Sequence, residues 1–267
     1  MKTIGFIGAG NMGGAMARAC TRVASQPVWI YDVNANVNKA FENEVKISVA
    51  SSISELMAQC DYVVLSVKPQ YYAQVAEQVR MYLTQTHVIV TVAPSYTMAD
   101  MTRLLGLKTK IVRTMPNTPA LVGQGITAYC YEENKVQESE LEDFIRYFES
   151  FGKLVRIEEH LMPAVVAATG SSPAYVYQFI EAMADAAVSF GMPRAMAYKM
   201  IGQAVKGSAE MVLSTEQHPG ALKDTVTSPG GTTIKAVLAM EEAGFRNSVI
   251  KGMEACYKQV LDMETQK

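Results

Sequence analysis

The sequence of 267 residues has little cysteine, and its cysteines form no pattern. The four, Cys20, Cys60, Cys130 and Cys256, are scattered, with no CxxC pair and no histidine at ligand spacing. This scatter argues against a disulfide framework and against a zinc site, so no metal is expected. We expect reduced thiols, as in a cytoplasmic protein.

Charge of one sign and long apolar runs are also missing. The formal net charge is −2 and no part of the chain is markedly basic, so neither nucleic acid nor an anionic membrane surface is expected as a partner. No run of 18 apolar residues occurs, and the first residues enter a strand pattern without a charged leader. The 49% of hydrophobic residues is enough for a globular core.

Short β-branched runs alternate with helical patterns in the first part of the chain. The candidate strands cover residues 3–7, 27–31, 62–66, 88–92, 110–113, 126–129 and 154–157. Short apolar strands separated by helices are typical of a parallel sheet covered on both faces. The sequence therefore predicts a doubly wound α/β domain over residues 1–160.

The pattern changes at about residue 161, where strand signals end and Ala, Met and Leu recur at helical spacing. An all-helical second domain is expected over residues 161–267. Its first long helix, within residues 174–192, is apolar on most of its circumference. Such a helix must be buried on several sides, so a partner subunit is expected. The alternative is a central helix buried within its own domain.

Gly8, Gly10 and Gly13 form a GxGxxG motif directly after the first expected strand and at the opening of a helix. In this context Gly8 permits a tight turn, Gly10 allows close approach of a pyrophosphate, and Gly13 allows close packing of helix and strand. The helix N-terminus would face the anionic phosphates. The motif therefore predicts a dinucleotide site, the alternative being a glycine-rich turn that binds nothing.

Asp32 ends the second expected strand, where a carboxylate can accept hydrogen bonds from the ribose hydroxyls of the adenosine. No arginine follows closely to hold a 2′-phosphate, which favours NAD over NADP. Asn34, Asn36 and Lys39 could still receive such a phosphate, and Asp32 could instead be an ordinary helix cap.

Two further segments follow strands at the edge where open α/β sheets bind ligands. Ser66, Lys68 and Pro69 come after the strand at 62–66, and the segment RTMPNTPA follows a later strand with Asn117 as a hydrogen-bonding side chain. Either segment alone could be a structural turn. Together with the glycine loop they outline a cofactor cleft.

Near the C-terminus a Pro-Gly-Gly turn interrupts the helical pattern, and a new helix opens at Thr232 and Thr233. Helix interiors exclude proline, so the interruption is a connection or a site. Uncommitted backbone N–H groups of Gly231, Thr232 and Thr233 at a helix N-terminus would bind a carboxylate. The alternative is that Thr232 only caps the helix.

The stretch LKDTVTSPGGTTIKAVLAME, residues 222–241, closely resembles the signature of the pyrroline-5-carboxylate reductases. The glycine loop, SVKPQ, MPNTPA and TGSSPAY are similar to that family's segments, in the same order. The resemblance covers essentially the whole chain. It implies a Rossmann-type domain followed by an all-α domain whose helices interleave into a homodimer. The resemblance also implies that the dimers can assemble further, and a decamer of dimers is one such assembly.

The resemblance also implies an activity, the reduction of the cyclic imine carboxylate Δ1-pyrroline-5-carboxylate to L-proline by NADPH or NADH, the last step of proline biosynthesis. Ser228 and the backbone at Gly231, Thr232 and Thr233 would hold the substrate carboxylate. The Thr233 hydroxyl would reach the ring nitrogen, which makes Thr233 and Ser228 the expected catalytic residues, and Glu216 would support the site. The expected cofactor-binding residues are Gly8, Gly10, Asn11, Met12, Gly13, Asp32, Ser66, Lys68, Pro69, Ala93 and Asn117.

The chain departs from the family pattern at three places. Ser172 stands where a glycine is common, and Pro94-Ser95 replaces an Ala-Gly pair near the expected nicotinamide face. The segment ASSISEL, residues 50–56, lacks an asparagine that is often found before the fourth strand near the adenosine. Two alternative functions stay open: a reductase of a six-membered cyclic imine, and a dinucleotide-binding regulatory protein without turnover. The histidines, at positions 87, 160 and 218, are expected to be ordinary surface or core residues.

Overall fold

The computed structural model describes residues 1–265. The chain forms two compact units: unit 1 is Met1–Ser171 with the described residues from Cys256 onward, and unit 2 is Ser172–Ala255. The sequence-based boundary lies at residues 160 and 161, whereas the compact units divide after Ser171. One physical reason is that the carbonyl oxygen of Thr169 accepts a hydrogen bond from the side chain of Asn117, within unit 1 (3.1 Å).

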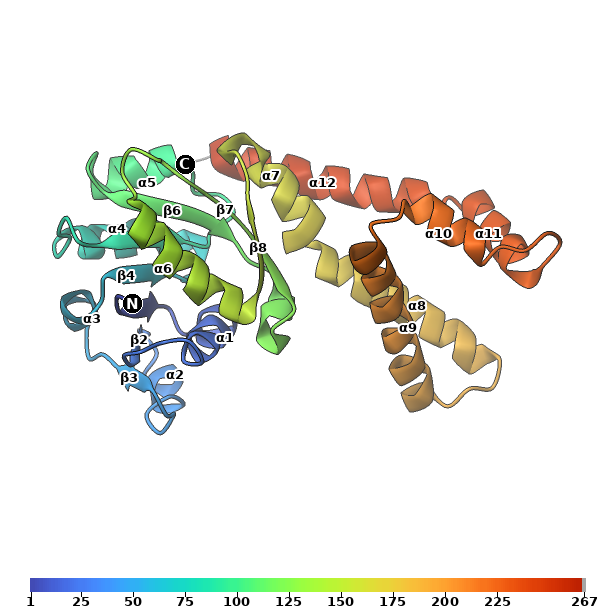
Figure 1. Ribbon diagram of the computed structural model, residues 1–267, viewed down its shortest axis with the longest axis horizontal. Helices are drawn as coiled ribbons and strands as arrows, with labels where there is room; N and C mark the ends of the chain where they lie inside the picture. Colours follow the sequence, from blue (N-terminus) through green and yellow to red (C-terminus); the bar gives the residue numbers. More distant parts are fainter. Residues whose placement is uncertain (266–267) are drawn as a thin grey trace. The chain divides into compact units, whose positions relative to one another are not determined.

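Unit 1 contains an eight-stranded sheet in the order β3-β2-β1-β4-β5-β6-β7-β8 (Figure 1). Each of the expected strands is present. A further strand, β3, was missed because it is three half-buried residues long. The strands are β1 (Ile4–Ile7), β2 (Val28–Tyr31), β3 (Ile47–Val49), β4 (Tyr62–Leu65), β5 (Val88–Thr91), β6 (Lys110–Met115), β7 (Gly125–Tyr131) and β8 (Gly152–Arg156).

The expectation of an all-parallel sheet is wrong at one pair. β7 runs antiparallel to β6, with Val112 opposite Tyr131, while every other neighbouring pair is parallel. A parallel return needs a long crossover, usually a helix. Here β6 and β7 are joined only by a short segment containing the 3-10 turn η2 (Thr118–Val122), so the chain reverses.

Helices cover both faces of the sheet, and each face has its own core. Side chains of α1 and α6, such as Met16 and Phe144, pack on one face against Phe6. Leu56 and Val79, from α3 and α4, pack on the other face. The helical elements of this part are α1 (Asn11–Cys20), α2 (Ala35–Lys39), α3 (Ile53–Gln59), η1 (Pro69–Tyr71), α4 (Tyr72–Arg80), α5 (Met98–Leu105), α6 (Glu138–Phe148), η3 (Glu149–Phe151), η4 (Glu159–Leu161), α7 (Met162–Val165) and the π-helix η5 (Val166–Gly170).

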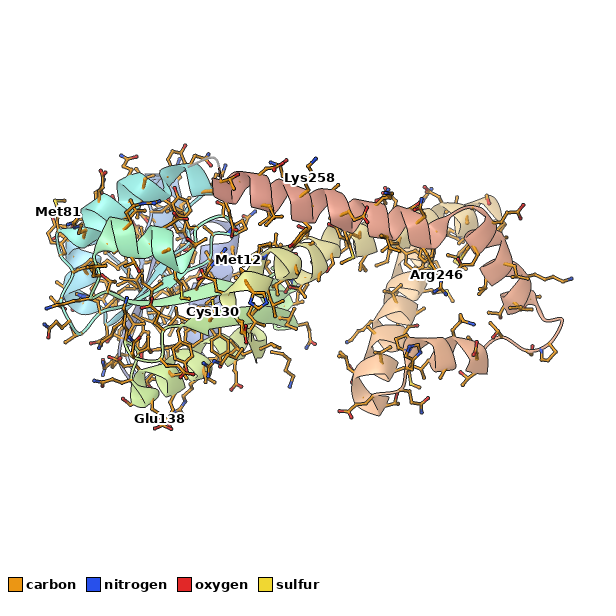
Figure 2. All side chains as sticks on the ribbon, turned by 90° about the horizontal axis from the view of Figure 1, so that it is seen from above. Met12, Met81, Cys130, Glu138, Arg246 and Lys258 are labelled. Carbon is orange, nitrogen blue, oxygen red and sulfur yellow. The ribbon has the colours of Figure 1, made fainter. Side chains whose placement is uncertain are left out.

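All cysteines are free thiols, as expected, and three of them lie in the cores of unit 1. Burial raises the pKa of the Cys20 thiol to about 12 and that of Cys130, labelled in Figure 2, also to about 12. These thiols therefore stay protonated and serve as apolar packing groups. Among residues 1–265, no helix is long and apolar enough to cross a membrane, and no cluster of side chains could hold a metal ion.

Unit 2 is helical, and its core is small. Only Ala184, Ala197 and Ile201 form its buried cluster, with a few partly buried neighbours. The alternative that the first long helix is buried within its own domain is wrong, because that helix buries only Pro173 and Ala184 in this chain. The helices are α8 (Ser172–Ser189), α9 (Arg194–Thr215), α10 (Pro219–Thr225), α11 (Thr232–Glu242) and α12 (Phe245–Thr265), which continues into unit 1.

Candidate active site

The glycine loop joins β1 to α1 and is as tight as the motif predicts. Gly8 has φ +94, a conformation that favours glycine. A Cβ added to Gly13 would lie 2.0 Å from the carbonyl oxygen of Gly8 and 2.5 Å from Ser66 Oγ, so no larger residue fits there. Gly10 is exposed, and nothing lies within 4 Å of its added Cβ. The loop therefore packs tightly against the rest of the protein at Gly13, whereas the space around Gly10 is open.

The start of α1 offers backbone donors to a ligand. Gly10 is the N-cap and supplies no side-chain hydrogen bond, and the first turn, which begins with Asn11 and Met12, contains no acidic residue. The first backbone N–H groups of a helix have no intrahelical acceptor, and the helix dipole adds positive potential. This end of α1 fits the pyrophosphate of a dinucleotide.

Asp32 is tied to the backbone around it. The N–H of Ala9 donates to Asp32 Oδ2 (2.9 Å) and the N–H of Asn34 donates to Asp32 Oδ1 (2.9 Å). The side chain of Asn38 in turn accepts a hydrogen bond from the backbone N–H of Asp32 and donates one to its carbonyl oxygen. The N-cap of α2 is Asn34, so Asp32 does not have the ordinary cap role considered for it. The carboxylate joins the glycine loop to the β2–α2 turn, and its remaining lone pairs stay available to a ribose.

Ser66 and the residues after it shape the middle of the same edge. Ser66 Oγ donates to the carbonyl oxygen of Gly8 (2.6 Å) and fixes the glycine turn. Lys68 is exposed and precedes η1, which opens with Pro69. Further on, the buried hydroxyl of Tyr72 donates to the carbonyl oxygen of Leu65 and accepts from the N–H of Val92 (3.0 Å). This hydroxyl ties the ends of β4 and β5 together, next to the buried Ala93.

Asn117 is placed at the edge, but its amide is occupied by the protein. Its Oδ1 accepts from the N–H of Ile126 (3.0 Å), and its Nδ2 donates to the carbonyl oxygen of Thr169 (3.1 Å). The side chain is 7% exposed. Asn117 therefore joins the start of β7 to the π-helix, and its contribution to the cleft comes from holding the loop rather than from a free side chain.

In unit 2, Ser228–Gly231 form a tight turn before α11. The N–H of Gly231 donates to the carbonyl oxygen of Ser228 (3.0 Å), and Gly230 has φ +72, as the third residue of a type II turn requires. The expectation of an uncommitted N–H at Gly231 is therefore wrong, because this N–H closes the turn. A Cβ on Gly231 would lie 2.5 Å from Ser228 Oγ, which also keeps the turn tight.

The alternative that Thr232 only caps the helix is also wrong. The N-cap of α11 is Gly231, which supplies no side-chain hydrogen bond, so Thr232 and Thr233 are the first two helical residues. Their side chains are exposed, and N–H groups at these positions have no intrahelical acceptor. The turn thus presents two backbone donors beside two hydroxyls, an arrangement whose chemistry suits a carboxylate.

Glu216 ends α9 in a strained conformation. Its φ is +54, and it shares a positive φ with only one other non-glycine residue, Lys46, among residues 1–265. Left-handed backbone costs free energy for residues with a Cβ, so a helix ending here on glutamate rather than glycine is an outlier of the kind that clusters at functional sites. The next residues lead directly into α10, where His218 Nδ1 accepts from the N–H of Gly220 (3.0 Å).

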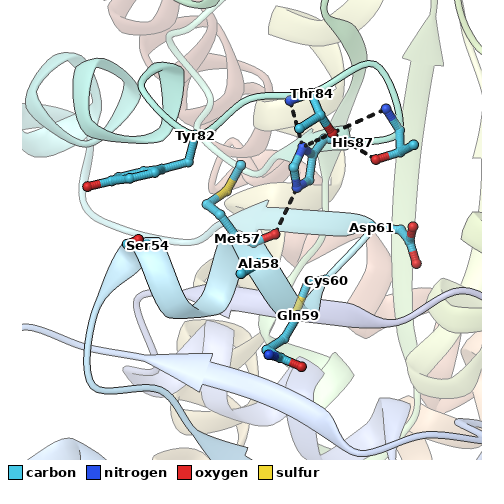
Figure 3. Close-up of a pocket in the computed structure, with 10 residues that line it drawn as sticks. Ser54, Met57, Ala58, Gln59, Cys60, Asp61, Tyr82, Thr84 and His87 are labelled. Atoms are coloured by element: carbon cyan, nitrogen blue, oxygen red, sulfur yellow. Dashed lines mark hydrogen bonds between the residues drawn. The ribbon is translucent and has the colours of Figure 1, made fainter.

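The hollow shown in Figure 3 lies at the other edge of the sheet and contains none of the expected site residues. Its volume is about 530 Å³, and it is bordered by Asp61 and His87, which precede β4 and β5. His87 Nδ1 accepts from the N–H of Thr84 (2.9 Å), and Nε2 lies 2.9 Å from the carbonyl oxygen of Met57. His87 and His218 are thus structural, as expected.

Comparison with known proteins identifies the family of the chain. The family described as pyrroline-5-carboxylate reductase dimerisation matches residues 159–263, and the family described as NADP oxidoreductase, coenzyme F420-dependent, matches residues 3–95. Pyrroline-5-carboxylate reductase of Escherichia coli (strain K12) is 44% identical over 97% of each chain. The chain belongs to the pyrroline-5-carboxylate reductase family.

Other reductases of this family are similar over the same length. That of Glycine max is 36% identical over 98% of this chain and 96% of its own. A solved structure of pyrroline carboxylate reductase from Plasmodium falciparum with NADP bound superposes with a TM-score of 0.89, at 31% identity, over 99% of this chain and 98% of that one. The fold of this reductase-family chain, a Rossmann-type sheet followed by a helical dimerisation domain, is thereby shown.

Sequence reasoning missed one group at the carboxyl edge of this reductase-family fold. Arg113, in β6, is 1% exposed and forms ion pairs with Glu159 and Glu264 (2.8 Å each). No local pattern indicates this cluster, because Glu264 lies 151 residues further along the chain. Only the fold brings the three side chains together.

Proposed function

We propose that this chain is a pyrroline-5-carboxylate reductase that reduces the C=N bond of Δ1-pyrroline-5-carboxylate with NADH or NADPH and gives L-proline, as the last step of proline biosynthesis. The observation that carries the proposal is the similarity to reductases of this name over 97% of the chain. The open glycine loop of unit 1 and the uncapped start of α11 in unit 2 support it. We assign cofactor binding to residues 1–160 and substrate binding and dimerisation to residues 161–267.

The residues of the carboxyl edge fit a nicotinamide dinucleotide. Asp32 would bind the adenosine ribose, and the N–H groups at Asn11 and Met12, with Gly8, Gly10 and Gly13 shaping the loop, would hold the pyrophosphate. Ser66, Lys68, Pro69, Ala93 and the Asn117 loop would border the nicotinamide half. When bound, the reduced nicotinamide supplies the hydride, and the protein supplies alignment and exclusion of water.

The Ser228–Gly231 turn and the start of α11 would bind the other reactant. We assign the substrate carboxylate to the N–H groups of Thr232 and Thr233, together with Ser228. The Thr233 hydroxyl would hold the ring nitrogen as it changes from iminium to amine, with the strained Glu216 as a supporting group. No strong acid is needed if the protonated imine is the species that binds, and this agrees with the lack of any carboxylate or histidine in the turn itself.

For the cofactor, Asp32 supports a modest preference for NADH. Its carboxylate would lie beside the ribose, where a 2′-phosphate would meet like charge. Asp32→Ala should lower kcat/KM for NADH more than for NADPH, because the ribose contact is lost for NADH while a repulsion is relieved for NADPH. Initial rates with both cofactors measure this difference. An equal loss with both would mean that Asp32 serves only to join Ala9 to Asn34.

We also propose a homodimer built by unit 2, in the cytoplasm, with a decamer of dimers as one possible higher assembly. The exposed apolar side chains of α8, such as Tyr177 at 59%, support self-association.

The experiment that tests the function is the initial rate of NADH and NADPH oxidation with Δ1-pyrroline-5-carboxylate and with its six-membered homologue. Faster turnover of the five-membered ring is expected. Faster turnover of the larger ring would mean that the six-membered cyclic imine is the substrate. Cofactor binding without any imine-dependent oxidation would favour a non-catalytic dinucleotide-binding protein.

A further inference from the structure

The guanidinium of Arg113 joins three segments at the carboxyl edge of the sheet. Nη1 donates to Glu159 Oε1 (2.8 Å), and Nη2 donates both to the carbonyl oxygen of Pro94 (2.8 Å) and to Glu264 Oε1 (2.8 Å). The Arg113 side chain is 2% exposed, and those of Glu159 and Glu264 are 29% and 17% exposed. Because the cluster is largely removed from solvent, its charge-assisted hydrogen bonds have defined geometry.

The same cluster holds the loop between β5 and α5 at both ends. Pro94 is bound by Arg113, and the N–H of Met98, the first residue of α5, donates to Glu159 Oε1 (2.7 Å). Between these points Ser95 is buried, and the ring of Tyr96 stacks on that of Tyr72 with centroids 4.8 Å apart. The backbone of residues 94–98 is therefore held at its two ends by Arg113 of β6 and Glu159 of η4, and Glu264 of α12 acts on it only through Arg113.

This loop lies on the nicotinamide side of the proposed cofactor cleft. Asp32 marks the ribose of the adenosine half beyond β2, and the pyrophosphate belongs at the start of α1 beside β1. In a sheet of order β3-β2-β1-β4-β5, the other half of a dinucleotide extends over the carboxyl ends of β4 and β5. The segment that follows β5 is residues 92–97, directly before Met98.

We propose that Glu264, acting through Arg113, positions the β5–α5 loop against the nicotinamide ring. The inference rests on the proposed function and makes Arg113 and Glu264 positioning residues. Glu264 is the informative one to change. Its loss leaves Arg113 paired with Glu159, whereas loss of Arg113 would leave two carboxylates without their cation and would damage the fold.

The test compares Glu264→Ala and Glu264→Gln with a matched control on the same helix, Glu254→Gln. Glu254 pairs only with the exposed Lys251 in the described part of the chain (3.3 Å). Without cofactor, hydrogen–deuterium exchange of residues 93–98 should become at least about threefold faster in Glu264→Ala, less so in Glu264→Gln, and unchanged in the control. Unchanged exchange in Glu264→Ala would overturn the proposal.

Kinetics then separate positioning from loss of folded protein. In Glu264→Ala, kcat should fall about 10-fold while KM for the imine changes less than about twofold, because the ring is misplaced but the imine receptor is intact. The isotope effect on kcat with 4-deuterated cofactor should rise, since hydride transfer becomes more rate-limiting. A fall in kcat with an unchanged isotope effect would contradict positioning.

The two proposals fail in distinguishable ways. If the wild type reduces no cyclic imine, the proposed function fails, and the exchange experiment together with the Kd of NADH and NADPH still tests the effect of Glu264 on the loop. If the wild type is active and Glu264→Ala matches Glu254→Gln in exchange, Kd and kcat, only the role of Glu264 fails.

Discussion

The two units differ in how much of their apolar surface one chain can bury. Unit 1 has a core on each face of its sheet, with side chains such as Phe6, Phe148 and Val90 fully buried. Unit 2 has three buried residues in its core, while Phe190 and Leu213 are 85% and 74% exposed. Even α11, which carries the proposed substrate residues, has no buried residue. Unit 1 buries its apolar side chains within one chain, whereas the exposed apolar side chains of unit 2 favour self-association, which we propose to be with a second copy.

This difference explains how the proposed cofactor-binding residues and the proposed substrate-binding residues are each supported. The cofactor half is built on strands whose order and packing are fixed within unit 1, so its geometry exists in each chain. The proposed carboxylate receptor is built on helices that share only a small core, so we expect its stability to depend on association. We therefore expect changes in unit 1 to act independently of protein concentration, and changes on the exposed helix faces of unit 2 to act through the oligomer.

The largest effect is expected where unit 1 is tightest. Gly13→Ala should abolish measurable cofactor binding and cost about 3 kcal/mol of unfolding free energy, because the new Cβ would meet the carbonyl oxygen of Gly8 at 2.0 Å. Gly10→Ala is the control for stability only, since nothing lies within 4 Å of its added Cβ and Gly10 is itself assigned to cofactor binding. Urea unfolding and fluorescence titration with NADH measure both. Equal stability of the two variants would contradict the packing described for the loop.

A charge on α8 should separate the subunits. Met183 is 38% exposed in one chain, and Met183→Lys would place an ammonium group in the proposed interface at a cost of several kcal/mol. Analytical ultracentrifugation should then show a monomer. Met81→Lys, at a residue of unit 1 that is 69% exposed and labelled in Figure 2, should leave the dimer intact. A Met183→Lys protein that is still dimeric would mean that α8 does not form the contact.

Removal of the Thr233 hydroxyl should act on chemistry alone. Thr233→Ala keeps the backbone N–H that we assign to the carboxylate, so KM should change little while turnover falls about 10- to 1000-fold. Steady-state kinetics give both values, and circular dichroism checks the fold. Thr225→Ala, with a hydroxyl bonded to the carbonyl oxygen of Leu222 (2.6 Å), is a threonine control in unit 2. Unchanged turnover in Thr233→Ala would remove Thr233 from the mechanism.

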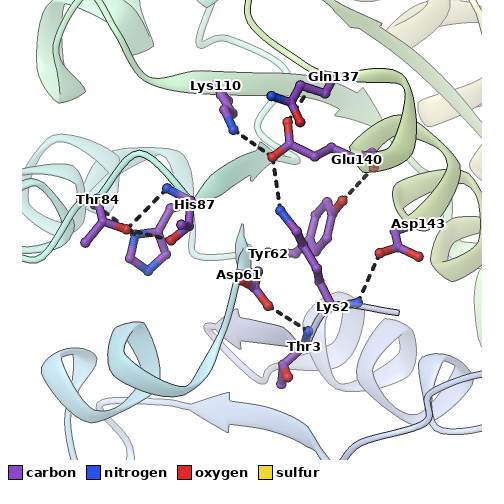
Figure 4. A network of polar contacts seen from close by, with 11 residues as sticks. Lys2, Thr3, Asp61, Tyr62, Thr84, His87, Lys110, Gln137, Glu140 and Asp143 are labelled. Atoms are coloured by element: carbon purple, nitrogen blue, oxygen red, sulfur yellow. Dashed lines mark hydrogen bonds and ion pairs between the residues drawn. The ribbon is translucent and has the colours of Figure 1, made fainter.

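The smallest effect concerns the polar network of Figure 4, at the amino edge of unit 1. Glu140 is 2% exposed and accepts from Lys110 Nζ (2.6 Å) and Lys2 Nζ (3.1 Å). Burial alone would raise the pKa of Glu140, but these lysines and the N–H of Gln137 outweigh burial and lower it below the usual 4.5. Glu140→Gln should cost about 2 kcal/mol at neutral pH.

The pH dependence of this cost has a definite sign. Because the folded carboxyl has the lower pKa, its stabilisation is fully present above pH 4.5, the usual value, and is lost as the pH falls through the lowered folded value. The difference in unfolding free energy between wild type and Glu140→Gln should therefore shrink below pH 4.5 and be independent of protein concentration. A difference that grows in acid would contradict the ion pairs described.

Local patterns predicted most of the fold, and they also indicated the glycine loop and the turn before α11 as candidate site segments. The strand runs, the glycine loop and the change to helices after residue 161 all have periods or motifs that can be read from neighbouring residues. The antiparallel β7 was missed because an apolar strand has the same pattern in either direction, and only the short β6–β7 connection decides it. The Gly231 cap was missed because threonine before a helical run is the usual cap signal.

Long-range polar contacts could not be predicted at all. Asp32 was expected to face a ribose, but its hydrogen bond from the N–H of Ala9 depends on how β1 and β2 are paired. The same holds for Arg113, whose carboxylate partners come from η4 and α12. A single sequence contains no signal for such pairs, because each residue type is ordinary in its own segment.

One measurement tests directly whether the cofactor half is complete in one chain and the substrate half depends on a second. For the Met183→Lys monomer, the Kd of NADH or NADPH and the imine-dependent turnover would be measured beside those of the wild-type dimer. We predict a Kd within about twofold of wild type and turnover reduced at least about 100-fold. A monomer that reduces the imine at the wild-type rate would contradict this prediction.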